Sequence, residues 1–281
     1  MMTQLPDWLT LWKKLSRIQT RAFERERSGG AEDFWQAKAR EFDQMAKKRW
    51  TTPDSSRKFL VNLLKAHPGA TLLDIGAGTG NWSLLSAPHA AAVTALDPSA
   101  AMQEILREKI RAADIGNITV RTGTWPESAG ETEPHDYVLA SHSMYGVEDF
   151  EGFAGQMSRA AKKACIMVLR APFARAPMGR ICHRVMGHPY DSPNFQVAYN
   201  ALLAMDIYPD VIMESQASWH VWTHDTLEQA VEEVKTRLNI WDDTSHDAFI
   251  RDCLETHLKQ DKGKWVWPPG NRSALVYWEI D

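Results

Sequence analysis

Three glycines in five positions follow an acid in the stretch TLLDIGAGTG, residues 71–80. The acid is Asp74, and the glycines are Gly76, Gly78 and Gly80. Glycines at the end of a strand let the backbone turn tightly and approach a ligand, and a following helix offers free N–H groups. The stretch therefore predicts a turn that holds a nucleotide-type ligand.

Several ligand classes use such turns. A Walker A phosphate loop needs a Lys after the last glycine, and Asn81 stands there instead, which excludes it. The dinucleotide fingerprint GxGxxG fits at Gly76 and Gly78, but Asn81 occupies its sixth position, which weakens NAD without excluding it. An acid beside the turn favours a cationic ligand, because a pyrophosphate prefers N–H donors and positive potential.

The segments DIGAGTG (74–80) and LDPSAAM (96–102) together resemble the class I, Rossmann-like S-adenosylmethionine-dependent methyltransferases, of the type that acts on small molecules. The resemblance covers about residues 70–172. It implies S-adenosylmethionine as the cofactor, whose methionine part carries an ammonium and a sulfonium. It also implies that Asp97 binds the ribose hydroxyls and that Met102 lines the adenine pocket. The cofactor-binding residues expected on this basis are Asp74, Gly76, Ala77, Gly78, Thr79, Gly80, Asp97, Pro98, Met102, Gly123, Thr124, Trp125 and Ser141.

The third strand departs from the family pattern. Many relatives carry an acid after this strand to bind the adenine amino group, whereas this chain reads TGTWPES. Thr124 or a backbone carbonyl is expected to take the amino group. Trp125 is expected to stack on the adenine or to flank it.

The fourth strand runs into SHSMYG, where the family brings the methyl sulfonium against the acceptor. Ser141, His142, Ser143 and Tyr145 are therefore expected to face or bracket the reaction space. Methyl transfer requires an aligned nucleophile and, for some acceptors, removal of a proton. His142 is the candidate base because imidazole titrates near neutrality, although packing at the strand end would also explain it. Tyr145 is the candidate orienting hydroxyl.

The acceptor is expected to be a small molecule with an apolar or aromatic body. The fourth strand does not end in NPPY or DPPY, no Pro-Cys nucleophile follows it, and the net charge of −4 disfavours nucleic acid. Arginines in the irregular stretch 170–195 invite an anionic group on the acceptor. The candidate acceptor-binding residues are Trp35, Phe42, Trp50, Arg170, His183 and Tyr190.

Two alternatives stay open. The basic residues 1–60 could recruit RNA or a protein as the acceptor. The chain could also bind S-adenosylmethionine without transferring its methyl group.

The order of predicted elements indicates an α/β fold. Helices are predicted over 6–26, 31–50 and 52–67, because apolar residues recur there at spacings of three and four. Five short β-type runs then alternate with helical ones, which predicts βαβ units and a parallel sheet. Those runs are 71–76, 91–98, 118–123, 136–143 and 163–172.

Two further strands, at 210–222 and 272–280, complete a doubly wound, mostly parallel, seven-stranded sheet. Helices at 225–239 and 245–259 are inserted before the last strand. We divide the chain into an N-terminal helical lid (1–65), a cofactor-binding core (66–172) and a segment of substrate loop, helical insertion and final strands (173–281).

Cysteine and hydropathy patterns exclude other classes. Cys165, Cys182 and Cys253 are widely spaced without a CxxC, so neither a disulfide framework nor a metal site is expected. No apolar run approaches about 18 residues, and no secretory signal is apparent, so no membrane partner and a cytoplasmic location are expected. The sequence leaves the oligomeric state undetermined.

Overall fold

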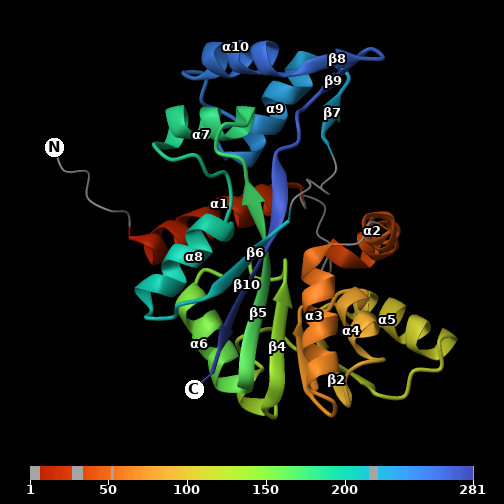
Figure 1. Cartoon of the computed structure of the whole chain (residues 1–281). Coiled ribbons are helices and arrows are strands. Elements are labelled where there is room, and N and C mark those ends of the chain that lie inside the picture. The colour runs from red at the N-terminus through yellow and green to blue at the C-terminus, as the bar shows by residue number, and fades with distance from the viewer. Residues whose placement is uncertain (1–6, 27–33, 52–53, 215–220, 281) are drawn as a thin grey trace.

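A seven-stranded sheet forms the centre of the computed structural model, which describes residues 7–26, 34–51, 54–214 and 221–280 (Figure 1). Its strand order is β3-β2-β1-β4-β5-β10-β6, with β10 antiparallel to both of its neighbours. The strands are β1 (Thr71–Ile75), β2 (Ala92–Asp97), β3 (Ile118–Thr122), β4 (His135–Ser141), β5 (Ala161–Pro172), β6 (Asp210–Met213) and β10 (Asn271–Glu279). The predicted doubly wound, mostly parallel sheet is confirmed.

Both faces of the sheet are covered, because successive side chains of a strand point to opposite faces. Leu73 and Ile75 of β1 belong to the core shared with α1 (Trp8–Glu26), α6 (Phe150–Ala160) and α8 (Phe195–Ala204). Leu72, which precedes them and points to the opposite face, belongs to the core under α3 (Ser55–Ala66), which is joined at its edge by α4 (Asn81–Ser86). The apolar runs of the parallel strands are therefore buried from both sides.

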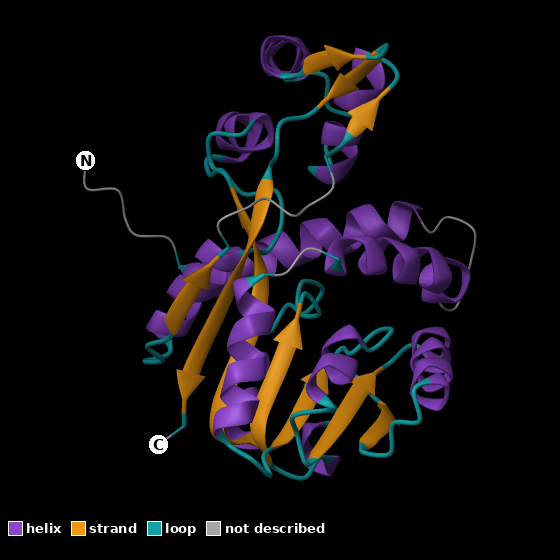
Figure 2. Cartoon of the chain, turned by 45° about the vertical axis from the view of Figure 1, so that its right-hand side comes forward, coloured by secondary structure: helices purple, strands orange, loops and turns teal. Residues whose placement is uncertain are grey.

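A smaller unit has a core of its own. It contains α7 (Pro177–Met186), α9 (Leu227–Arg237), α10 (Asp247–His257) and a sheet of β7 (Thr223–His224), β9 (Lys264–Val266) and β8 (Lys259–Asp261). Ile181, Val234, Leu254 and Trp267 are buried together in it. Figures 1 and 2 show this unit beyond the edge of the large sheet toward which β4 and β5 point.

The smaller unit corrects two predictions. The stretch 170–195 is not irregular throughout, because it contains α7, which starts at Pro177 and ends before Gly187 in the left-handed conformation. The stretch KGKWVWPPGNR (262–272), for which the sequence predicts an aromatic loop, is not all loop, because it contains β9 of a hairpin that turns at Lys262 and Gly263, both with positive φ. The predicted strand 210–222 ends at Met213, and its residues 215–220 lie outside the described part of the chain.

Helix α3 is fastened to the edge of the large sheet by one carboxylate. Glu214, directly after β6, accepts hydrogen bonds from the backbone N–H groups of Ser55 (3.1 Å) and Ser56 (2.8 Å) and from both hydroxyls (2.7 Å each). Burial alone would raise the pKa of Glu214, but these hydrogen bonds outweigh it and hold the pKa below its ordinary 4.5. A carboxylate at a helix N-terminus is also favoured by the helix dipole.

Among the described residues, the helices are too short or too polar to cross a lipid bilayer.

We predict that Glu214→Gln lowers the free energy of unfolding by about 1–3 kcal/mol at neutral pH, because charge-assisted hydrogen bonds are lost. The stabilisation from a depressed carboxyl pKa is present above its unfolded value and disappears as the pH falls through the folded one. The difference between wild type and variant should therefore shrink below about pH 4.5. Urea unfolding at several pH values measures this, with exposed Glu255→Gln as the control. A constant difference across pH would contradict the assignment.

Candidate functional site

The glycine turn between β1 and α4 is held by close contacts. Gly76, Gly78 and Gly80 have positive φ values of 67°, 56° and 83°. A Cβ on Gly76 would lie 2.3 Å from Cβ of Ser143, and one on Gly80 would lie 2.1 Å from Cδ1 of Leu106. The first and third glycines are therefore required by packing as well as by conformation.

Asp97 at the end of β2 joins this turn to the next helix. One of its oxygens accepts the N–H of Gly78 and the other the N–H of Ser99, each at 2.8 Å. Ser99 in turn caps α5 (Ala100–Ala112). The predicted ribose-binding acid thus also fixes the shape of the turn, which the sequence did not indicate.

Asp74 lies beneath the turn with 1% of its surface exposed. Its carboxylate accepts the hydroxyl of Ser83 at 2.6 Å. Burial raises the pKa of Asp74 to about 7. The hydrogen bond from Ser83 lowers this pKa, whereas the negative charge of Asp97 raises it further. A cation near the turn would therefore favour the ionised form of Asp74.

Helix α2 (Phe34–Trp50) covers the turn from outside. Cε1 of Phe42 lies 4.0 Å from the position that a Cβ on Gly78 would take, with nothing else within that distance. Met102 is buried under the same helix in a cluster with Ala39. Lys109 of α5 forms an ion pair with Asp43 of α2 and donates to the carbonyl of Thr79 at 2.8 Å.

The segment after β3, residues 123–125, was expected to line the adenine site, but its tryptophan lies elsewhere. Trp125 is 4% exposed, packs in the core beside α6 and donates its indole N–H to the carbonyl of Phe153 at 3.2 Å. This position argues against the predicted stacking of Trp125 on adenine. Gly123 lies tight against Ser128, and the carbonyl of Thr124 accepts the N–H of the same serine.

The ends of β4 and β5 bring three predicted residues together. His142, with a φ of 56°, shares a hydrogen bond of 2.7 Å between its Nδ1 and Oη of Tyr145. The backbone N–H of Arg170 donates to the same Oη at 2.7 Å, and the guanidinium lies over the Tyr145 ring with its carbon 4.0 Å from the centroid. Beside them, Ser143 donates to the carbonyl of Ile75 at 2.8 Å, which links this group to the glycine turn.

The charges around this group set its protonation. Desolvation lowers the pKa of His142 well below its ordinary 6.5, and the charges of Arg49 and Arg170 lower it further. Burial raises the pKa of Tyr145 above 10, although the same arginines oppose the shift. His142 is therefore neutral and Tyr145 protonated near neutral pH. Arg49 was missed from sequence because it lies in the basic run KKRW, which is typical of a solvated helix face.

The other predicted acceptor residues are spread out. Trp50 packs edge-on against Trp82 of α4, with ring centroids 5.3 Å apart. Tyr190 stacks on His188 and packs against the core of the large sheet, and His183 is exposed on α7. The side chain of Trp35 lies outside the described part of the structure.

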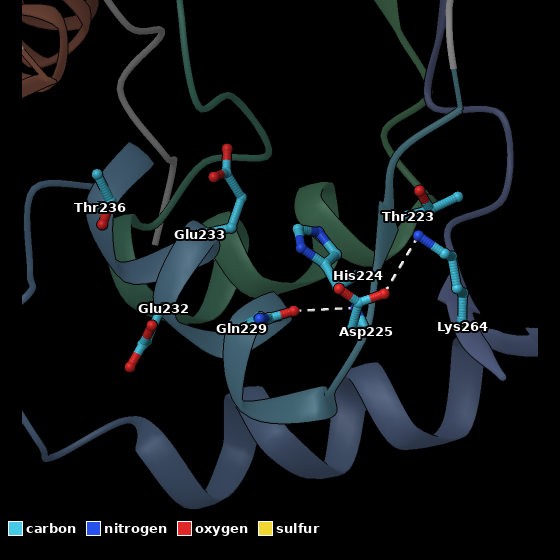
Figure 3. A pocket seen from close by; sticks show the side chains of 8 residues that line it. All are labelled: Thr223, His224, Asp225, Gln229, Glu232, Glu233, Thr236 and Lys264. Carbon is cyan, nitrogen blue, oxygen red and sulfur yellow. Dashed lines mark hydrogen bonds and ion pairs between the residues drawn. The ribbon is translucent and has the colours of Figure 1, made fainter.

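A polar pocket of about 390 Å³ lies on the smaller unit (Figure 3). In it, Asp225 forms an ion pair with Lys264 at 3.1 Å, and the backbone N–H of Asp225 donates to the side-chain oxygen of Gln229 at 2.9 Å. Its lining is Thr223, His224, Asp225, Gln229, Glu232, Glu233, Thr236 and Lys264. None of these residues was predicted from sequence to bind cofactor or acceptor. The residues that were predicted to do so lie mainly at the ends of the strands of the large sheet. Within the described ranges, no group of three or more His, Cys, Asp or Glu is arranged to hold a metal ion.

This strand order, with a glycine turn after β1 and acids ending β1 and β2, defines a class I, Rossmann-like methyltransferase. A family model described as "Methyltransferase domain" matches residues 40–234, more than half of the chain. The chain belongs to this family of methyltransferase domains.

Curated relatives match a shorter region. A demethylmenaquinone methyltransferase of Listeria welshimeri is 31% identical over 117 residues, which cover 39% of this chain and 50% of that protein. The protein of the same name from Shouchella clausii is 30% identical over 111 residues, covering 38% and 47%. The chain thus spans about half the length of the curated relatives it matches.

Solved structures extend the likeness of fold. Magnesium protoporphyrin IX methyltransferase from Synechocystis PCC 6803, with bound SAH, covers 98% of this chain and 100% of its own, with a TM-score of 0.50 and 15% identity. YcgJ from Bacillus subtilis covers 80% and 97%, with a TM-score of 0.50 and 12% identity. At these identities the likeness concerns the fold alone.

We predict that Arg170→Gln raises the pKa of His142, because one of the positive charges that disfavour imidazolium is removed. Titration of labelled histidine side chains by NMR, with His142 assigned through His142→Asn, measures the change. Arg175→Gln, an exposed arginine of the same segment, is the control. An unchanged or lower pKa of His142 in Arg170→Gln would be inconsistent with the electrostatics described.

In the wild type, the neutral His142 stabilises the fold above its unfolded pKa near 6.5, and this contribution is lost as the pH falls toward the depressed folded value.

Proposed function

We propose that the chain transfers the methyl group of S-adenosylmethionine directly, in line, to a small-molecule acceptor. One observation carries the proposal: Ser143 touches both sides of the site. Its Cβ lies against Gly76 of the glycine turn, and it stands next to His142 in the group formed with Tyr145 and Arg170. A ligand on the turn and an acceptor at the end of β4 would therefore be neighbours.

The residues at the turn fit the cofactor chemically. Gly78 leaves open space up to Phe42, so a ligand can approach the backbone there. Asp97 offers carboxylate oxygens to hydroxyl groups, and Asp74 offers a negative charge beneath a cationic methionine part. Bound S-adenosylmethionine supplies an electrophilic methyl group on sulfur. The remaining cofactor contacts predicted from sequence, including Pro98, Met102, Thr124 and Ser141, stay predictions.

A small acceptor is supported by position and by the relatives. The reaction space lies between the strand ends and the elements beyond them, α1, α2 and the smaller unit, which we propose act together as a lid. The curated relatives named above are demethylmenaquinone methyltransferases, whose name specifies a small molecule. An acceptor with an apolar or aromatic body suits Phe42 and Tyr145 at this place. His142 and Tyr145 align the acceptor, and base assistance by His142 would apply only to an acceptor that must lose a proton.

We also propose a cytoplasmic location. The three cysteines are buried and free, as is typical of a reducing compartment.

We predict that S-adenosylmethionine and S-adenosylhomocysteine bind the wild type, that NAD does not, and that Asp97→Ala weakens both at least about tenfold. The variant removes the proposed ribose acceptor together with the hydrogen bonds to Gly78 and Ser99. Isothermal titration calorimetry measures the three ligands, with Asp252→Ala on the exposed face of α10 as the control. Binding of NAD alone would overturn the proposal and indicate a dehydrogenase.

After binding is established, a screen of small-molecule acceptors for methylated product distinguishes an enzyme from a cofactor-binding protein. Salt-dependent binding of RNA would instead favour the RNA alternative.

A further inference from the structure

Arg170 carries a positive charge that no carboxylate of the described residues contacts. No carboxylate of the described ranges lies within 4.0 Å of its guanidinium. The neighbouring acid, Asp191, is engaged by Arg237, which donates to one of its oxygens at 2.8 and 3.2 Å. Asp191 is hydrogen-bonded to Arg237, and the more distant charge of Arg170 also lowers its pKa, but Asp191 makes no ion pair with Arg170.

The guanidinium of Arg170 is held in place by neutral groups. Its Nη2 donates to the side-chain oxygen of Gln19 of α1 at 2.9 Å, and its plane lies over the Tyr145 ring. Its Nε is buried and has no hydrogen-bond partner. A buried, oriented donor of a fixed cation without an acceptor is the arrangement expected where a ligand supplies the acceptor.

The hydrogen positions of Tyr145 and His142 follow from the backbone. A backbone N–H can only donate, so Oη of Tyr145 accepts from Arg170. We assign the phenol hydrogen to the bond with Nδ1 of His142, because this satisfies the buried hydroxyl in both of its roles. A neutral imidazole that accepts at Nδ1 carries its own hydrogen on Nε2. Neither ring nitrogen then has a lone pair available for a proton from the acceptor.

We propose that the methyl acceptor is an organic anion whose carboxylate or phenolate oxygen is bound by Arg170 and receives the methyl group without a general base. This rests on the proposed function and names the acceptor class for it. When the anionic oxygen bonds to the methyl carbon, the carbon–sulfur bond breaks and its electron pair stays on sulfur. The oxyanion and the sulfonium both become neutral, and no proton is released. In this scheme His142 and Tyr145 are positioning residues for Arg170.

Calorimetric titration of the S-adenosylhomocysteine-loaded chain tests the proposal. The probes are benzoate, its neutral analogue benzamide, and 4-nitrophenolate. We expect benzoate or 4-nitrophenolate to bind at least about tenfold more tightly than benzamide. A preference for benzoate assigns a carboxylate acceptor, and a preference for 4-nitrophenolate assigns a phenolate.

Variants locate the effect. Arg170→Gln should abolish the preference for the anion while keeping the affinity for S-adenosylhomocysteine, Arg170→Lys should retain part of it, and Arg175→Gln should leave it unchanged. On the wild type, the preferred anion should also shift the ring resonances of His142, whereas benzamide should not. This measurement on the wild type tests the anionic acceptor even if Arg170→Gln does not fold.

The outcomes separate the two levels of the proposal. Failure of S-adenosylhomocysteine to bind would contradict the proposed function itself. Normal binding of S-adenosylhomocysteine, with equal affinity for anions and benzamide or with unmoved His142 resonances, would overturn only the anionic acceptor.

Discussion

The close passage of the glycine turn between two neighbours is the constraint on which the site depends. Ser143 fills the space beside Gly76, and Leu106 fills the space beside Gly80. A side chain at either glycine would meet both this contact and the strain of a left-handed backbone, about 1–2 kcal/mol by itself. The turn is thereby fixed against β4 on one side and α5 on the other. This fit sets the distance between the glycine turn and the end of β4.

The charges of the site are sorted along the sheet. Asp74 and Asp97 lie at the ends of β1 and β2, whereas Arg170 lies near the end of β5, beside the neutral His142 that follows β4. β1 and β4 are neighbouring strands. The two acids therefore meet the group around Arg170 at the point where the strand order of the sheet reverses. A cationic ligand and an anionic ligand would each meet complementary charge from opposite sides. Burial sharpens this separation, because it strengthens electrostatic interactions on both sides.

Short sequence patterns predicted the parallel strands and the residues at their ends. The parallel strands appear as apolar runs, and the glycine turn, Asp97, His142 and Tyr145 lie within a few residues of the ends of those runs. β8 was not predicted, because its residues Lys259–Asp261 are all exposed and show no alternation. The pairing of Asp43 with Lys109 and the approach of Arg49 to His142 depend on how α2 packs, which no short sequence pattern records. Trp125 was predicted to contact the ligand because of its place after β3, but its ring is buried in the core beside α6.

The position of β10 has a consequence for the order in which the molecule is made. β10 lies between β5 and β6, although it follows both of them in the sequence. On the ribosome, β6 and the whole smaller unit emerge before the strand that connects β6 to the sheet exists. Until residues 271–279 are synthesised, β5 has an open edge, and the nascent chain must keep that edge from pairing with other molecules. The synthesis of β10 is therefore the step that closes this side of the sheet.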